Sequence, residues 1–183
     1  MSKNVLITIA DGIEEIEAVC LIDTLRRAGA QVTVASVGKL DITASRGVKL
    51  TADKLIEDCV GENYDLIVLP GGLPGAEHLR DDSLLIEMLV KQKAAGKLYS
   101  AICASPAVVL GTHRLLDDKK ATCHPALSDK LICKEKVPGR VVVDRNCVTS
   151  QGPGTALELA IELVRQLFGS ERAKQVAAPM LIE

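Results

Sequence analysis

The sequence predicts an α/β protein whose mostly parallel β-sheet is covered by helices on both faces. Two observations lead to this fold class. Short, nearly continuous apolar runs alternate with amphipathic stretches, and several amphipathic stretches end at a glycine. Continuous apolar runs are typical of strands buried on both faces, and their alternation with helices is typical of a parallel sheet. No repeat or low-complexity segment interrupts the 183 residues, so we expect one domain over residues 1–183.

The expected strands are short runs of apolar and β-branched residues. They fall at residues 5–10, 31–37, 64–69, 98–102, 141–144 and 147–149. The run at 64–69, YDLIVL, stops at Pro70-Gly71-Gly72, a sequence that ends strands. Because binding sites in such sheets form where strands end and helices begin, the residues after each strand are the places to look for chemistry.

The expected helices are amphipathic stretches that end at glycine. They span residues 13–28, 84–95 and 156–168, which are followed by Gly29, Gly96 and Gly169. Thr155 and Glu158 have the spacing of a capping box, so we expect them to cap the third of these helices.

The composition excludes several classes of protein. The formal charge is −2, which gives no electrostatic reason to expect a nucleic acid or a membrane surface as partner. The first residues become polar too early for a signal peptide, and no apolar run is long enough to span a membrane. The six cysteines form no C-x-x-C pair and fit no zinc-finger spacing. We therefore expect reduced thiols in a cytoplasmic protein, with no metal and no cofactor.

Cys103 is the strongest candidate for a catalytic residue. The segment LYSAICASP at 98–106 ends an expected strand and begins a helix, with small residues on both sides of the cysteine. A nucleophile elbow requires small neighbours, because its tight turn lifts the reactive atom out of the sheet. The N–H groups of the next helix are expected to lower the pKa of the thiol. The alternative is a buried structural cysteine, which free cysteines usually are, but the elbow favours function.

Glu17 is the second candidate. Within the helix expected at 13–28, Ile13, Cys20 and Leu21 lie one turn from it, which puts its carboxyl on the apolar stripe. Burial raises the pKa of a carboxyl, so a protonated Glu17 beside Cys103 is able to donate to a thiolate or move a proton. The alternative, in which Glu17 only complements the helix dipole, stays open at this point.

Two further groups are expected near the same strand ends. His124, in the segment ATCHP, follows Cys103 by 21 residues and is a candidate acid or base, although a histidine before a proline is more often a loop residue. The backbone N–H groups of Gly72 and Ala104 are expected to form an oxyanion hole. The turn at Pro70-Gly71-Gly72 lacks the spacing of a nucleotide-binding loop.

Seven segments of the sequence resemble the DJ-1/ThiJ/PfpI superfamily, and within it the DJ-1 and YajL branch. They run nearly from end to end: GIEEIE at 12–17, LRRAG at 25–29, SRGV at 45–48, VLPGG at 68–72, AICASP at 101–106, HP at 124–125 and SQGPGT at 150–155. The resemblance implies a flavodoxin-like three-layer sandwich and a homodimer. It also implies that Cys103 is an oxidisable nucleophile, that Glu17 is the protonated carboxyl beside it, and that His124 is the family's nearby histidine.

The resemblance assigns further residues and shows two departures. Arg46 and Arg27 match arginines near the dimer interface, where Arg46 is expected to reach the active-site glutamate of the partner. Ser105 replaces the usual glycine or alanine and is expected to narrow or polarise the pocket. Gln151 stands where many relatives have arginine, which argues against an anion-binding role at that position.

Three functions follow from the residues and the resemblance. The preferred one is cofactor-free detoxification of 2-oxoaldehydes such as methylglyoxal and glyoxal, or deglycation of early adducts, in defence against oxidative and carbonyl stress. The second is a redox sensor or chaperone-like stress protein that acts through oxidation of Cys103 to a sulfinic acid. The third is a cysteine peptidase or amidotransferase-like hydrolase. We rank it last, because it needs a histidine base oriented as in a true Cys-His pair.

Overall fold

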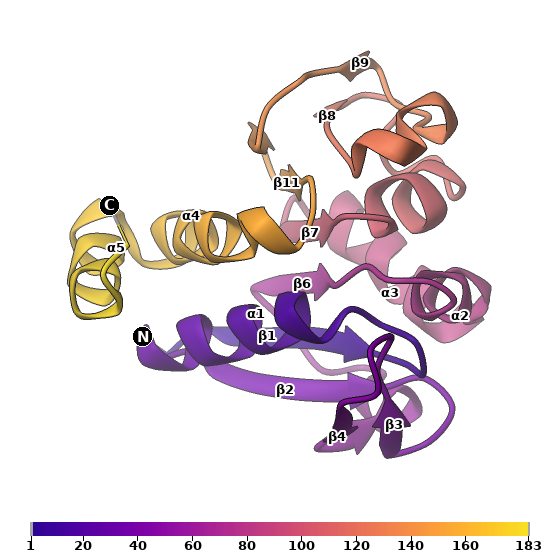
Figure 1. Cartoon of the computed structure of the whole chain (residues 1–183), viewed down its shortest axis with the longest axis horizontal. Helices are drawn as coiled ribbons and strands as arrows, with labels where there is room; N and C mark the ends of the chain where they lie inside the picture. Colours follow the sequence, from indigo (N-terminus) through magenta and orange to yellow (C-terminus); the bar gives the residue numbers. More distant parts are fainter. Residues whose placement is uncertain (1, 183) are drawn as a thin grey trace.

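The computed structural model describes residues 2–182, and it has the α/β architecture expected from the sequence (Figure 1). Within this range seven strands form the main sheet, in the order β10-β11-β7-β6-β1-β2-β5. Their bounds are β1 Asn4–Ile9, β2 Gln31–Ser36, β5 Lys54–Leu55, β6 Leu66–Leu69, β7 Leu98–Ile102, β10 Val141–Asp144 and β11 Cys147–Ser150.

The sheet is parallel except at one edge. Strands β1, β2, β5, β6, β7 and β11 pair in parallel, whereas β10 pairs with β11 in antiparallel register. The carboxyl ends of the central strands are aligned, since Leu69 pairs with Ala101 and Ile102 pairs with Ser150. The residues that leave these strands therefore meet at one edge of the sheet, as expected for a doubly wound fold.

Helices cover both faces of the sheet and give it two apolar cores. Helices α1 (Glu15–Arg27), α4 (Ala156–Phe168) and α5 (Ser170–Ala177) pack against one another over one core. Helices α2 (Gly75–Asp81) and α3 (Ser83–Ala94) and the π-helical turn η2 (Pro106–Gly111) cover the other. Two small two-stranded sheets, β3 (Asp41–Thr43) with β4 (Lys49–Thr51) and β8 (Lys120–Ala121) with β9 (Glu135–Lys136), extend from this frame.

Three 3-10 helices lie between these elements. They are η1 (Ile56–Cys59), η3 (Pro125–Lys130) and η4 (Pro153–Thr155). A fourth 3-10 helix, η5 (Ala178–Met180), follows α5. In the part of the chain that the structure describes, no helix is long and apolar enough to cross a membrane.

The capping box expected at Thr155 and Glu158 is wrong. The Thr155 hydroxyl makes no capping bond to α4; it donates to the carbonyl of Gly152 at 2.9 Å and lies 2.6 Å from the Ser150 hydroxyl. Glu158 instead forms an ion pair with Arg140. The reason is that η4 precedes α4. This short helix directs the Thr155 side chain toward Ser150 at the end of β11, where the hydroxyl is buried.

Candidate active site

Cys103 occupies a strained elbow directly after β7. Its φ is 63°, in the left-handed region that residues with a side chain rarely adopt. Its N–H donates to the Ser150 carbonyl at 3.0 Å, and its carbonyl accepts from the N–H of His124 at 2.8 Å. Strained backbone of this kind persists only where the surroundings impose it, and it clusters at functional sites. The chain therefore turns at Cys103 as the sequence predicts, although a π-helical turn and not an α-helix follows.

Gly71 lets a second strand end approach the elbow closely. A Cβ atom at this position would lie 2.6 Å from the Cys103 Cβ and 2.8 Å from the Ala104 nitrogen. Only a glycine fits without moving the elbow, because these contacts are shorter than carbon atoms tolerate. The sequence places Gly71 in a strand-ending turn, but the need for glycine becomes visible only when β6 and β7 are seen side by side.

Glu17 is fully buried in the first turn of α1. Its N–H donates to the side chain of Glu14, the residue that caps the helix, at 2.8 Å. Its Oε2 accepts from the N–H of Gly71 at 2.7 Å, while Oε1 has no conventional partner among the described residues. The Cys103 thiol lies beside this carboxyl and interacts with it. The structure thus brings Glu17 and Cys103 together, and the carboxyl does not face solvent.

Burial sets the protonation of Glu17. Loss of water raises the pKa of its carboxyl from 4.5 to about 7, and the neighbouring Glu14 charge acts in the same direction. Hydrogen bonds from Gly71 and from Cys103 act in the opposite direction, but they are outweighed. A carboxyl with a pKa in this range is able both to hold and to release a proton near neutral pH.

The pKa of Cys103 differs from the value expected from the sequence. Burial, followed by the Glu17 charge, raises the pKa of the thiol to about 12, whereas the helix argument predicted a lower value. The N–H groups of Gly72 and Ala104 lower it, but less strongly. The physical reason is that the thiol is largely enclosed and faces a carboxyl, which a helix-dipole argument from sequence does not include.

Together, the two groups behave as one titrating unit. Because Glu17 loses its proton near pH 7 and Cys103 near pH 12, the Glu17–Cys103 pair holds a single proton above about pH 7. Two atoms can carry this proton: the Cys103 sulfur and a Glu17 carboxyl oxygen. A proton on Glu17 removes the charge that opposes the thiolate, so transfer from sulfur to oxygen produces a nucleophile without any change in net charge.

The Gly72 and Ala104 N–H groups lie on the thiol side of the pair. Both donate toward the Cys103 sulfur and stabilise its charged form. Gly72 reaches this position with a φ of 89°, and a Cβ there would lie 2.5 Å from the Glu14 nitrogen. The two donors come from different strand ends, the turn after β6 and the elbow after β7. They converge on the sulfur of Cys103, where they favour a thiolate.

His124 is attached to the elbow through its backbone. It caps η3, and its Nδ1 accepts a hydrogen bond from the N–H of Ala126 at 3.2 Å. An Nδ1 that accepts must be unprotonated, so the ring proton of the neutral form resides on Nε2. The ring is half-buried and lies against Gly152, in the turn after β11.

Neither Arg27 nor Arg46 makes a hydrogen bond or ion pair with Cys103 or Glu17 among the described residues. Arg27, near the end of α1, forms an ion pair with Asp23 at 2.7 Å. Arg46 is exposed, and only its backbone is bound, through an N–H that donates to Glu15 at 2.8 Å. Glu15 also accepts from the Ser45 hydroxyl at 2.9 Å and is itself buried. This carboxylate, which sequence reasoning missed, fixes the turn that carries Arg46 close to the start of α1.

The two departures from the family pattern have different surroundings. Ser105 is fully buried, and its hydroxyl donates to the carbonyl of Pro70. It therefore ties the elbow to the end of β6 and does not polarise a pocket. Gln151 is half-buried and lines a cavity of about 330 Å³ next to Cys123 and Lys136.

Comparison with known proteins agrees with this geometry. The model of the DJ-1/PfpI family matches residues 3–166. Protein DJ-1 homolog B of Arabidopsis thaliana is 49% identical over 99% of this chain, which spans only 42% of that protein's length. Glutathione-independent glyoxalase DJR-1.2 of Caenorhabditis elegans is 33% identical, with 92% of this chain and 90% of that protein covered.

A solved structure extends the agreement to three dimensions. Toxoplasma gondii DJ-1 in its oxidized form superposes with a TM-score of 0.97 at 50% identity, over 99% of both chains. The whole described chain thus has the fold of a solved DJ-1 structure. The chain belongs to the DJ-1/PfpI family.

Proposed function

We propose that this protein is a cysteine-dependent, cofactor-free enzyme that converts reactive 2-oxoaldehydes, such as methylglyoxal and glyoxal, into hydroxy acids. The observation that carries the proposal is the pair formed by Cys103 in its strained elbow and the buried Glu17. Addition of a nucleophile to an aldehyde needs a proton carrier and donors that stabilise the carbonyl oxygen. Cys103, Glu17 and two backbone N–H groups at one strand edge would fill these roles. The glyoxalase name of the relative from Caenorhabditis elegans supports the same chemistry.

The proposed reaction balances without an added oxidant or reductant. The Cys103 thiolate adds to the aldehyde carbon of methylglyoxal, and the resulting alkoxide takes up a proton to give a hemithioacetal. Loss of the proton on that carbon gives an enediol, and protonation of the neighbouring carbon gives a lactoyl thioester. Water then cleaves the thioester, which releases lactate and restores the thiol. The overall reaction converts methylglyoxal and water into lactate. The aldehyde carbon is oxidised and the ketone carbon is reduced, so no external oxidant or reductant is needed.

Each group in the site has a role in these steps. The N–H groups of Gly72 and Ala104 would stabilise the alkoxide, since preorganised donors act most strongly where charge develops. Glu17 would hold the thiol proton during attack and then move protons between the two carbons. The free Nε2 of His124 is available as a second proton carrier. Deglycation of early adducts uses the same attack on a carbonyl-derived carbon, and we propose it as a related activity.

The deciding experiment compares cysteine variants in a buffer without glutathione. Cys103→Ala and Cys103→Ser should abolish lactate formation from methylglyoxal while both proteins remain folded. Cys133→Ala is the matched control, because Cys133 is also a half-buried free cysteine but does not interact with Glu17, Gly72 or Ala104. If Cys103→Ala keeps most of its lactate production, the proposed function is wrong.

A redox-sensing role is the second candidate. Its support is the set of donors around the sulfur, which suits a sulfinate as well as an alkoxide, and the oxidized state named for the Toxoplasma gondii structure. In this case oxidation of Cys103 would be the signal, and turnover of aldehydes would be secondary. Both roles start from a reduced Cys103 thiol. We therefore propose that the protein acts in the cytoplasm, where thiols stay reduced.

We also propose that the protein works as a homodimer. The outer side of α1 leaves Ile16 and Val19 exposed, at 54% and 46%, next to the turn that carries Arg46. Apolar side chains exposed together beside an unpaired cation are typical of a contact surface. A second copy seated there would bring a guanidinium toward the first turn of α1.

A further inference from the structure

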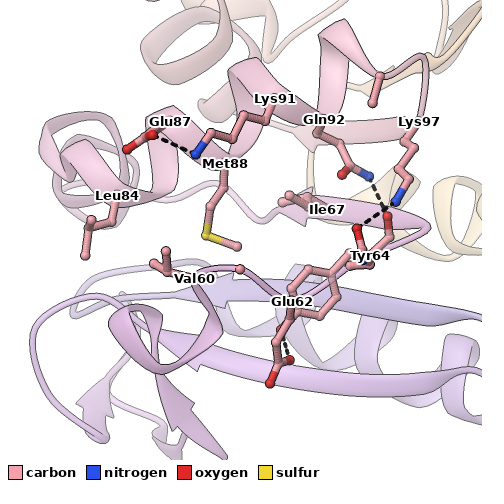
Figure 2. Close-up of a pocket in the computed structure, with 13 residues that line it drawn as sticks. Val60, Glu62, Tyr64, Ile67, Leu84, Glu87, Met88, Lys91, Gln92 and Lys97 are labelled. Atoms are coloured by element: carbon pink, nitrogen blue, oxygen red, sulfur yellow. Dashed lines mark hydrogen bonds and ion pairs between the residues drawn. The ribbon is translucent and has the colours of Figure 1, made fainter.

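A second cavity lies at the amino-terminal edge of the sheet, away from the residues around Cys103. It has a volume of about 240 Å³ and is formed by the segment 60–64, which leads into β6, and by one face of α3 (Figure 2). None of the residues proposed for aldehyde chemistry lines it. A ligand bound in this cavity would therefore be distinct from the aldehyde substrate.

The walls of the cavity are mostly apolar. Val60, Ile67, Leu84 and Met88 line it, and Figure 2 shows the Met88 thioether between Val60 and Ile67. The side chain of Tyr64 forms part of the wall, and its hydroxyl is held by Glu62 at 2.7 Å. Aliphatic groups, a thioether and an aromatic ring together favour a compact ring compound over a flexible polar one.

Gln92 supplies an acceptor that receives no hydrogen bond from the described residues. Only 6% of this residue is exposed, and its Nε2 donates to the carbonyls of Tyr64 at 3.2 Å and Leu98 at 2.9 Å. Those two carbonyls fix the orientation of the amide, since an oxygen in place of the nitrogen would face two acceptors. The Oε1 atom accepts nothing from residues 2–182, and Figure 2 shows it turned from the Tyr64 carbonyl toward the cavity.

Lys97 supplies a cationic donor at the same end of the cavity. Its Nζ contacts only Asn63 Oδ1, at a distance of 3.5 Å, and no ion pair involves it among the described residues. The other charged groups that line the cavity are already paired, Glu62 with Lys54 and Glu87 with Lys91. Gln92 Oε1 and Lys97 Nζ thus supply an acceptor and a cationic donor to the lining of one cavity that also has apolar walls.

We propose that this cavity binds a small planar lactam, that is, one or two fused rings with a cis-amide edge. The ring N–H would donate to Gln92 Oε1, the adjacent carbonyl would accept from Lys97 Nζ, and the ring would pack against Ile67, Met88 and Tyr64. A carboxylate would satisfy Lys97 but would place an acceptor against Gln92, and a hydrocarbon would leave both groups unpaired. A volume of about 240 Å³ lies below the range of drug-sized sites and suits a molecule of this size.

The test uses isoquinolin-1(2H)-one as probe, with its N-methyl derivative as the matched compound without the N–H. Titration of the ¹⁵N-labelled full chain should give saturable shifts at Tyr64, Gln92 and Lys97, with a dissociation constant near or below about 1 mM. The N-methyl derivative should bind at least about tenfold more weakly, because it leaves the Gln92 oxygen unpaired. Lys97→Met should weaken binding of the probe by severalfold.

Two tryptophan variants show whether the cavity itself is the site. Val60 and Val90 are both 48% exposed, but only Val60 lines the cavity. Val60→Trp should abolish the shifts, and Val90→Trp should leave them unchanged; lactate formation should survive in both. The proposal is wrong if the probe gives no saturable shifts, if the N-methyl derivative binds equally well, or if the two variants behave alike.

Discussion

The buried carboxyl of Glu17 and the thiol of Cys103 interact although 85 residues of sequence lie between the two. Glu17 comes from the first turn of α1, and Cys103 from the elbow after β7. The Gly71 N–H, which donates to the carboxyl at 2.7 Å, connects them through the turn after β6. The parallel sheet makes this possible, because it brings three strand ends to one edge.

Replacing Glu17 by glutamine should change how stability depends on pH. The folded-state pKa of about 7 lies above the ordinary 4.5, so the wild type is favoured at low pH and loses stability as the pH rises toward 7. Glu17→Gln has no carboxyl to ionise and should gain relative to the wild type by up to about 3 kcal/mol at pH 8.

Urea unfolding of both proteins at pH 5 and pH 8 measures this difference. The exposed Glu57→Gln serves as control; it keeps Glu17 and should therefore follow the wild type at both pH values. An equal effect of Glu17→Gln at pH 5 and pH 8 would mean that the carboxyl is not buried as described.

The same variant separates catalysis from redox sensing. A glutamine keeps the shape and one donor but cannot transfer a proton, so Glu17→Gln should lower aldehyde turnover by about 10²–10⁴-fold. Survival of peroxide-stressed cells that carry the variant is measured in parallel. Lost turnover with full protection would reject detoxification as the main role, whereas loss of both with normal oxidation of Cys103 would reject the sensor.

Mild peroxide should oxidise Cys103 before the other cysteines. Three of the six, Cys59, Cys123 and Cys147, are buried, and Cys103 has the N–H groups of Gly72 and Ala104 aimed at its sulfur. Cys133 also has two backbone donors, but it does not interact with Glu17. These donors and a protonated Glu17 would hold a sulfinate, the product with two added oxygens. Peptide mass spectrometry follows the order of oxidation, and earlier modification of Cys20 or Cys147 would contradict the assignment.

The homodimer predicted from the family resemblance can be tested by measuring the mass of the protein in solution. Light scattering at micromolar concentration should give about twice the chain mass of 19.5 kDa. Arg46→Glu should shift the mass toward that of the monomer, whereas Arg114→Glu, an exposed change outside the proposed surface, should not. A mass of one chain for the wild type would reject the dimer.

Much of the frame could be predicted from sequence, because apolar runs and glycine stops are local signals. Strand β7, strand β10 and helix α4 have the expected bounds. The hairpin of β3 and β4 was missed, since Asp41–Thr43 and Lys49–Thr51 form no apolar run.

The sequence singled out Glu17 and Cys103, which the structure brings together, but it did not predict the electrostatics between them. Periodicity placed Glu17 on a buried face, and small neighbours marked Cys103 as an elbow. The contact of Gly71 with both residues depends on strands that are distant in sequence, and no local pattern shows it. The predicted direction of the Cys103 pKa shift was wrong for the same reason. Burial and the facing Glu17 carboxyl raise this pKa more than the backbone donors lower it.

The central claim is that the single proton of the pair moves to Glu17 and leaves a thiolate on Cys103. The most direct measurement is the rate at which iodoacetamide alkylates Cys103 between pH 5 and pH 10, followed by peptide mass spectrometry. The account predicts a rise with a midpoint near the Glu17 pKa of about 7 and a plateau above it, because ionised Glu17 is then able to take the thiol proton and the thiolate fraction no longer depends on pH. A rate that keeps rising tenfold per pH unit to pH 10 would contradict it, because the proton would then remain on sulfur.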